Sequence, residues 1–244
     1  MSSKKGHYGW KKTTYQSWSQ LPLKSGTYDN AIWVEKNLST LKHRRENNVG
    51  ADTGSKLLPD SVNKINKSFV RIVDYGGGLG LSYFPLIKKT NKQIDYHIVE
   101  PPNMATAGQE NVPEISFTSD VPKNLKNVDI FYIGTALQYS QDWHSLLQDI
   151  ISLQPSSVVL AQVTVSDAPS YLVLQCWADQ EIPYWVLNRE ELKTIVSEGG
   201  YECVCDEYVD DLNFKTPNGK KVHNDLDRTH WNPILVDLVF DRKK

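Results

Sequence analysis

From residue 69 onwards, short apolar runs alternate with amphipathic stretches. Short apolar runs predict strands at 70–74, 94–100, 115–118, 128–133 and 157–165. Apolar residues at helical spacing predict helices at 81–89, 103–111, 143–153 and 189–197. Strands that alternate with helices predict a parallel sheet covered by helices on both faces.

The end of the chain breaks this alternation. Two strands are expected at 201–209 and 234–240, and the polar segment between them carries no helical pattern. A parallel crossover needs a dozen or more residues, usually helical, so the last two strands should form an antiparallel pair. The sequence therefore predicts an α/β fold with a Rossmann-like, seven-stranded, mostly parallel sheet and a closing antiparallel hairpin.

The first 68 residues have a different pattern. Trp10, Tyr15, Trp18, Tyr28 and Trp33 stand among polar residues, and a helix is expected at 29–45. The segment is too short and too polar to form a domain of its own. We therefore expect residues 1–68 to be a helical lid or packing extension, and residues 69–244 to be one α/β domain.

Composition narrows the class of protein. A formal net charge of −2 and scattered basic residues give no sign of nucleic-acid binding. No apolar stretch approaches the ~20 residues that span a bilayer, and the N-terminus lacks the apolar segment of a secretory signal. Three cysteines without framework spacing point to a reducing compartment, so a cytoplasmic protein is expected.

A glycine-rich loop follows the first strand of the α/β region. The dinucleotide motif G-x-G-x-x-G fails, because its third position falls on Leu81 or Tyr83. No lysine follows at the spacing of a phosphate-binding loop. The pattern that fits is D-x-G-x-G-x-G at 74–80, which resembles the first motif of class I S-adenosylmethionine-dependent methyltransferases. That resemblance implies S-adenosylmethionine as cofactor, held by Asp74, Gly76, Gly77, Gly78 and Gly80.

Three later positions extend the resemblance. Glu100 ends the next expected strand, where a carboxylate accepts both hydrogen bonds of a ribose diol. Pro101 offers an apolar surface to adenine, and the side chains after the third strand of this fold usually reach the adenine amino group. The turn after the fourth strand lies beneath the cofactor. The resemblance thus adds Glu100, Pro101, Ser119, Asp120, Thr135 and Gln138 to the expected cofactor site.

A narrower resemblance covers nearly the whole chain. It is to a methyltransferase family found mostly in bacterial surface-polysaccharide and lipopolysaccharide gene clusters. The matching segments are T-Y-Q-S-W at 14–18, S-G-T-Y-D at 25–29, D-Y-G-G-G-L-G at 74–80, V-E-P-P at 99–102, L-Q-Y at 137–139, L-Q at 174–175 and I-P-Y-W-V-L-N at 182–188. The family often has Asp-Arg-Thr where this chain has Gln162, Val163 and Thr164. The resemblance implies O-methylation of a sugar or glycan precursor.

Methyl transfer to a hydroxyl benefits from a general base or a metal. His230, in the long polar loop before the last strand, is our preferred base, and Tyr139 is expected to orient the acceptor. The His and Asp residues of that loop could bind a divalent metal instead, but their spacing is not diagnostic, and no metal site is predicted. Residues expected to contact the substrate are Gln175, Trp177, Glu181 and Tyr184.

Two other functions stay open. The chain could be a non-catalytic cofactor-binding subunit of a polysaccharide-assembly complex, or a methyltransferase for another small molecule. A sugar-nucleotide dehydrogenase or epimerase is disfavoured by the failed dinucleotide spacing and by the lack of a Tyr-x-x-x-Lys pair. The expected partner is a carbohydrate or other small-molecule acceptor, without nucleic acid or a membrane span, and a homodimer is left open.

Overall fold

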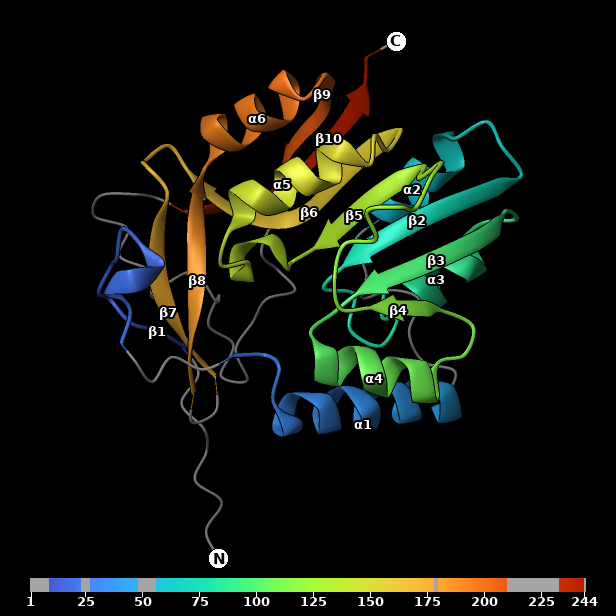
Figure 1. The fold of residues 1–244 in the computed structure, drawn as a ribbon, viewed down its shortest axis with the longest axis horizontal. Helices are drawn as coiled ribbons and strands as arrows, with labels where there is room; N and C mark the ends of the chain where they lie inside the picture. The colour runs from blue at the N-terminus through green and yellow to red at the C-terminus, as the bar shows by residue number, and fades with distance from the viewer. Residues whose placement is uncertain (1–8, 23–26, 48–55, 178–179, 210–232, 244) are drawn as a thin grey trace, which may run out of the picture.

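The computed structural model describes residues 9–22, 27–47, 56–177, 180–209 and 233–243 (Figure 1). The strands are β1 (Gly9–Trp10), β2 (Phe69–Tyr75), β3 (Gln93–Val99), β4 (Ser116–Thr118), β5 (Ile130–Gly134), β6 (Ser157–Ser166), β7 (Tyr171–Trp177), β8 (Gln180–Asn188), β9 (Tyr201–Tyr208) and β10 (Ile234–Arg242). The helices are α1 (Ala31–Asn47), α2 (Leu57–Lys64), α3 (Tyr83–Lys89), α4 (Pro102–Asn111), α5 (Trp143–Ser152) and α6 (Arg189–Glu198), with 3₁₀ turns η1 (Trp18–Gln20) and η2 (Leu137–Tyr139). None of the described helices is long and apolar enough to cross a membrane.

The centre of the fold is a seven-stranded sheet in the order β4-β3-β2-β5-β6-β10-β9. β2 to β6 run parallel, and β10 lies antiparallel between β6 and β9 (Figure 1). This confirms the predicted fold, including the antiparallel pair formed by the last two strands.

A second, smaller sheet was not foreseen in the sequence. β7 and β8 form an antiparallel hairpin, and β1 from the N-terminal segment pairs with β7. β8 joins the main sheet only where Val165 and Ser166 of β6 meet Leu187 and Asn188. The hairpin is buried on both faces, so its sequence lacks the polar alternation that marks a half-exposed strand.

Two apolar layers cover the main sheet. Alternate residues of one strand face opposite layers, as Val73 and Ile72 of β2 do. One layer packs α5 and α6 on the sheet through residues such as Trp143, and the other packs α2, α3 and α4 through residues such as Met104. α2 belongs to residues 1–68, yet its Leu58 lies in the second layer, so this part of the N-terminal segment shares the core of the sheet.

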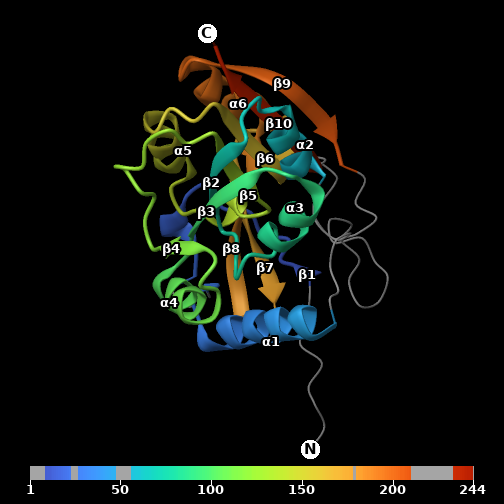
Figure 2. The same ribbon diagram turned by 90° about the vertical axis from the view of Figure 1, so that its right-hand side faces the viewer.

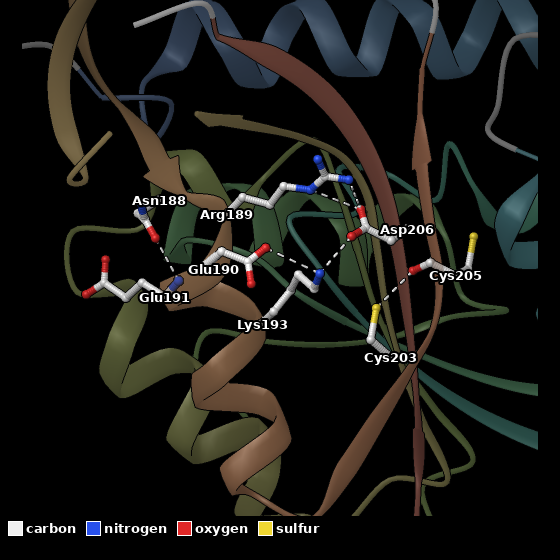
Figure 3. A network of polar contacts seen from close by, with 8 residues as sticks. All are labelled: Asn188, Arg189, Glu190, Glu191, Lys193, Cys203, Cys205 and Asp206. Carbon is white, nitrogen blue, oxygen red and sulfur yellow. Dashed lines mark hydrogen bonds and ion pairs between the residues drawn. The ribbon is translucent and has the colours of Figure 1, made fainter. Parts of the chain in front are cut away.

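Polar contacts cap the start of helix α6 and connect the helix to β9 (Figure 3). Asn188 caps it, because its Oδ1 accepts the Glu191 N–H at 2.7 Å, which confirms the predicted helix start. Asp206 of β9 pairs with Arg189 at 2.5 Å and with Lys193 at 3.0 Å. These contacts hold the outer strand of the closing hairpin against the helix that precedes it.

Helix α1 lies alongside α4 in both ribbon views (Figures 1 and 2). Leu41 is buried in the α2–α4 layer, and Arg45 binds the Asn111 carbonyl and the Glu114 carboxylate. Further along the N-terminal segment, Tyr15 forms a β-bridge with Leu172 of β7. The described N-terminal residues therefore contact both the main sheet's helices and the small sheet.

Candidate active site

The glycine loop, residues 76–80, follows β2 and turns next to the ends of β3 and β5. Gly76 has φ +73° and donates its N–H to the Val99 carbonyl at 2.9 Å. A Cβ on Gly76 would lie 2.3 Å from the Ala136 Cβ, and one on Gly77 would lie 2.4 Å from Asp74 Oδ2. A Cβ at either position would overlap another part of the protein, so Ala136 and Asp74 can pack against the loop backbone only because these residues are glycine.

Asp74 lies behind this loop, on β2. Its side chain is buried, and Tyr96 Oη donates a hydrogen bond to its Oδ2 at 2.7 Å. The pKa of Asp74 is raised to about 7, mainly by burial. The Tyr96 hydrogen bond opposes this rise, and the charge of Glu100 contributes to it. Asp74 does not line the cavity described below, and its carboxylate fills the space beside Gly77 of the loop.

Glu100 follows β3 and faces the loop from the other side. Its Oε1 accepts the Gly78 N–H at 2.6 Å. Burial raises the pKa of Glu100 to about 7, the Gly78 hydrogen bond opposes this rise, and the charge of Asp29 adds to it. Two carboxyl groups with raised pKa values thus flank one glycine loop, an arrangement common at functional sites.

A cavity of about 490 Å³ opens at the carboxyl ends of β2, β3 and β5, beside Gln162 of β6. Ligands of open α/β sheets bind at this edge. Nine of the residues predicted from the sequence line it: Gly76, Glu100, Pro101, Ser119, Thr135, Gln138, Tyr139, Gln175 and Tyr184.

The other predicted residues lie elsewhere. Gly77, Gly78 and Gly80, like Asp74, do not line the cavity, nor do Asp120, Trp177 and Glu181. Asp120 is exposed, and Glu181 forms an ion pair with Lys11 at 2.8 Å. Trp177 packs edge-on against Trp33, with Lys36 Nζ 4.9 Å from its ring centroid. His230 lies outside the described residues.

Two residues in the left-handed backbone region shape the cavity floor. Thr135, after β5, has φ +58°, and Gln162 of β6 has φ +56°. The Gln162 N–H donates to Asp237 Oδ1 at 2.8 Å, where the register of β10 shifts. Non-glycine residues adopt this conformation at a cost in free energy, so the surrounding structure must hold them in it. Such residues are found preferentially at functional sites.

A buried polar network connects these strand ends. Gln138 Nε2 donates to the Gln162 carbonyl at 3.1 Å and to Tyr184 Oη at 3.3 Å. Tyr184 Oη is also hydrogen-bonded to Thr164 Oγ1. Gln138 Oε1 is buried without a hydrogen-bond partner among the described residues. The two contacts of Nε2 fix which way the amide of Gln138 points.

An aromatic wall forms the opposite side of the cavity. We use this name for Trp10, Tyr184, Tyr139, Tyr28 and Trp33, whose ring centroids follow one another at 4.6, 5.0, 4.8 and 4.6 Å. All of them line the cavity, and they come from β1, β8, η2 and the N-terminal segment. Rings packed in this way present an extended, rigid, apolar surface.

Gln175 is the polar centre of this wall. Its Oε1 accepts hydrogen bonds from Tyr28 Oη at 2.7 Å and from Tyr139 Oη at 2.9 Å. Burial raises the pKa of Tyr28 to about 12 and that of Tyr139 well above its ordinary value. Both phenols therefore stay protonated and donate, which leaves the Gln175 amide N–H groups facing away from them.

Sequence reasoning missed Trp10, Tyr28, Trp33 and Gln162 as site residues. The only signal was the unusual density of aromatic residues in a polar segment. Gln162 was noted as a departure from the resembled family and not as a residue of the site. No group of three His, Cys, Asp or Glu side chains that could hold a metal ion occurs among the residues described.

Comparisons with known proteins establish the fold. No protein-family model matches the chain, and no curated protein matches it. Similar solved structures include a Haloferax volcanii chain in complex with the Trm112 methyltransferase activator, with TM-score 0.57, 14% identity and 89% and 96% of the two chains covered. Another is a Burkholderia thailandensis 1,6-didemethyltoxoflavin N1-methyltransferase with S-adenosylhomocysteine, with TM-score 0.52, 15% identity and coverage of 92% and 93%.

A third is an S-adenosylmethionine-dependent methyltransferase from Clostridium acetobutylicum, with TM-score 0.52, 9% identity and coverage of 86% and 99%. At these identities the similarity is one of fold. The chain has the α/β fold on which these solved methyltransferases are built.

Proposed function

We propose that this protein is an S-adenosylmethionine-dependent methyltransferase. The observation that carries the proposal is the position of Glu100, whose carboxylate lies against the glycine loop and lines the cavity with Pro101 and Ser119. Solved neighbours of the same fold contain S-adenosylhomocysteine, as the Burkholderia enzyme does. Gly76 is the glycine of the loop that lines the cavity, so a ligand there would contact its backbone.

Each part of the cavity has a distinct role in this proposal. Glu100 would accept hydrogen bonds from the ribose diol, Pro101 and Ser119 would border the adenine, and Gly76 and Thr135 would border the methionine part. The cofactor supplies a methyl group already activated by its sulfonium. The protein therefore contributes mainly by position and by exclusion of water.

For the acceptor, we propose a hydroxyl of a sugar or glycan precursor. The resemblance to the polysaccharide-cluster family supports this, and so does the chemistry of the aromatic wall. Aromatic rings stack on sugar faces while nearby amides such as Gln175 hydrogen-bond hydroxyl groups. Tyr139 stays protonated, so its role is to orient the acceptor through Gln175 and not to take up a proton. His230 as general base stays a prediction, as do a cytoplasmic location and a homodimer.

A second acceptor class is a planar heterocycle. The Burkholderia neighbour carries a bound 1,6-didemethyltoxoflavin, and a flat ring suits the aromatic wall as well as a sugar does. The two classes differ in their polar groups, so competition experiments with each can separate them.

The first experiment is calorimetric titration with S-adenosylmethionine and S-adenosylhomocysteine. Micromolar binding that Glu100→Gln weakens at least tenfold is expected, since a neutral amide cannot accept both diol hydrogen bonds as a carboxylate does. Glu35→Gln, on the exposed side of α1, removes the same charge and serves as the control. Absence of binding to the folded wild type would refute the proposal.

Turnover separates a methyltransferase from a non-catalytic cofactor-binding subunit. The protein is incubated with methyl-labelled S-adenosylmethionine and a panel of monosaccharides, nucleotide sugars and planar heterocycles. Label transfer to one acceptor class identifies it. Tight cofactor binding without transfer to any extract of glycan precursors would favour the non-catalytic subunit.

A further inference from the structure

Residues 27–37 touch three separate parts of the cavity's surroundings. We call this stretch the roof segment, and it comprises the approach to α1 and the first two turns of that helix. Thr27, Tyr28 and Trp33 line the cavity together with Glu100 and Pro101. The segment is therefore in contact with the space that the proposed cofactor would fill.

The first contact is with helix α4. Asp29 Oδ1 accepts the Asn103 N–H at 3.1 Å, in the first turn of the helix that directly follows Glu100 and Pro101. A carboxylate at a helix N-terminus satisfies a free N–H and interacts favourably with the helix dipole. Asp29 thereby holds the roof segment beside the expected ribose position.

The second contact is with the small sheet. Tyr28 Oη donates to Gln175 Oε1 of β7, and Asn30 Nδ2 lies 3.2 Å from Gln180 Oε1 of β8. Asn30 Oδ1 also accepts the Trp33 N–H at 2.9 Å, which caps the start of α1. The segment thus bridges from α4 to the β7–β8 hairpin across the cavity.

The third contact is with the glycine loop. Asn37 is buried, its Nδ2 donates to the Trp33 carbonyl at 2.9 Å, and its Oδ1 lies 3.2 Å from the place that a Cβ on Gly78 would occupy. The amide oxygen of Asn37 therefore faces the loop on which the cofactor would rest. One turn further along α1, Leu41 is buried in the α2–α4 layer and holds the rest of the helix in place.

We propose that the roof segment is a wall of the cofactor site, and that its lifting from α4 and β7 sets the rate at which S-adenosylmethionine and S-adenosylhomocysteine enter and leave. This rests on the proposed function, because it assigns the cofactor to the cavity. The start of the segment is held by hydrogen bonds through Tyr28, Asp29 and Asn30. Ring contacts of Tyr28 with Tyr139 and of Trp33 with Trp177 add to them. Leu41 keeps the second half of α1 in place, so these contacts at the start of the segment are the ones that lifting must break.

The test measures the dissociation rate of S-adenosylhomocysteine by stopped-flow displacement. A typical hydrogen bond contributes a factor of about five to an equilibrium. Tyr28→Phe and Asp29→Ala should each raise the dissociation rate about fivefold, and the double variant more than tenfold. Asp29→Asn should stay close to wild type, because an amide oxygen still caps α4. Glu35→Gln is the control for loss of an acidic residue from α1.

Hydrogen exchange of the wild type gives a second readout that needs no variant. Amides of residues 27–37 should exchange at least tenfold more slowly with S-adenosylhomocysteine bound. Two results would overturn the inference by showing a purely structural clamp. One is unchanged exchange when S-adenosylhomocysteine binds. The other is a dissociation rate of the double variant within twofold of wild type although its thermal midpoint falls. Failure of the wild type to bind S-adenosylhomocysteine would instead overturn the proposed function, and the roof with it.

Discussion

Replacement of Asp74 by asparagine should stabilise the ligand-free protein at high pH. The pKa of Asp74 is raised from 3.8 to about 7 by burial. Between these values the folded state keeps the proton that the unfolded chain has lost, so it binds more protons and loses stability as the pH rises. Three pH units at about 1.4 kcal/mol each give a cost of up to about 4 kcal/mol, complete above pH 7. Asparagine does not titrate and can still accept the Tyr96 hydrogen bond, so it avoids this cost.

The assay is urea denaturation of wild type and Asp74→Asn at several pH values from 4.5 to 8. The difference in unfolding free energy should grow in favour of the variant as the pH rises. Glu100 titrates in both proteins and largely cancels in that difference. Asp149→Asn, on the exposed side of α5, is the matched control and should not show the trend. Parallel pH profiles for wild type and Asp74→Asn would refute the reasoning, because they would mean that burial does not hold the proton on Asp74.

Three further substitutions test other parts of the fold. Gly77→Ala should cost about 1–3 kcal/mol and weaken S-adenosylhomocysteine binding in calorimetry, because the new Cβ would lie 2.4 Å from Asp74 Oδ2. Trp143→Ala should lower the unfolding free energy by about 3–5 kcal/mol in urea titration, since this first residue of α5 is buried in the layer that packs the helix on the sheet. Asn188→Ala should cost at least about 1 kcal/mol in the same titration, because it removes the α6 cap and the Nδ2 hydrogen bond to the Ala168 carbonyl. Asn188→Asp should keep the cap and lose only the Nδ2 hydrogen bonds.

The sheet and the side of the cavity that Gly76 and Glu100 form could be predicted because their signals are local. Each parallel strand is a short apolar run followed by a turn, and the carboxyl ends of parallel strands meet at one edge. Gly76, Glu100, Pro101 and Ser119 therefore come together without knowledge of any distant contact.

The aromatic wall could not be predicted, because it depends on pairings across long separations. Tyr28 and Gln175 are 147 residues apart and meet only because β7 folds back beside the N-terminal segment. Glu181 was expected to contact the substrate because it is a carboxylate among aromatic residues after the fifth expected strand, but it pairs with Lys11 and does not line the cavity. Gln162 carries no sequence signal for a left-handed backbone, which glycine and asparagine would give.

The cavity can also be understood as a gap in the ladder of backbone hydrogen bonds. β5 pairs with β6 only as far as Ala161, and β8 joins β6 only from Val165. Between these points the Gln162 carbonyl accepts a hydrogen bond from the side chain of Gln138, in place of the backbone N–H that a neighbouring strand would supply. The cavity thus lies where one strand stops early and a glutamine completes the hydrogen bonding that it leaves behind.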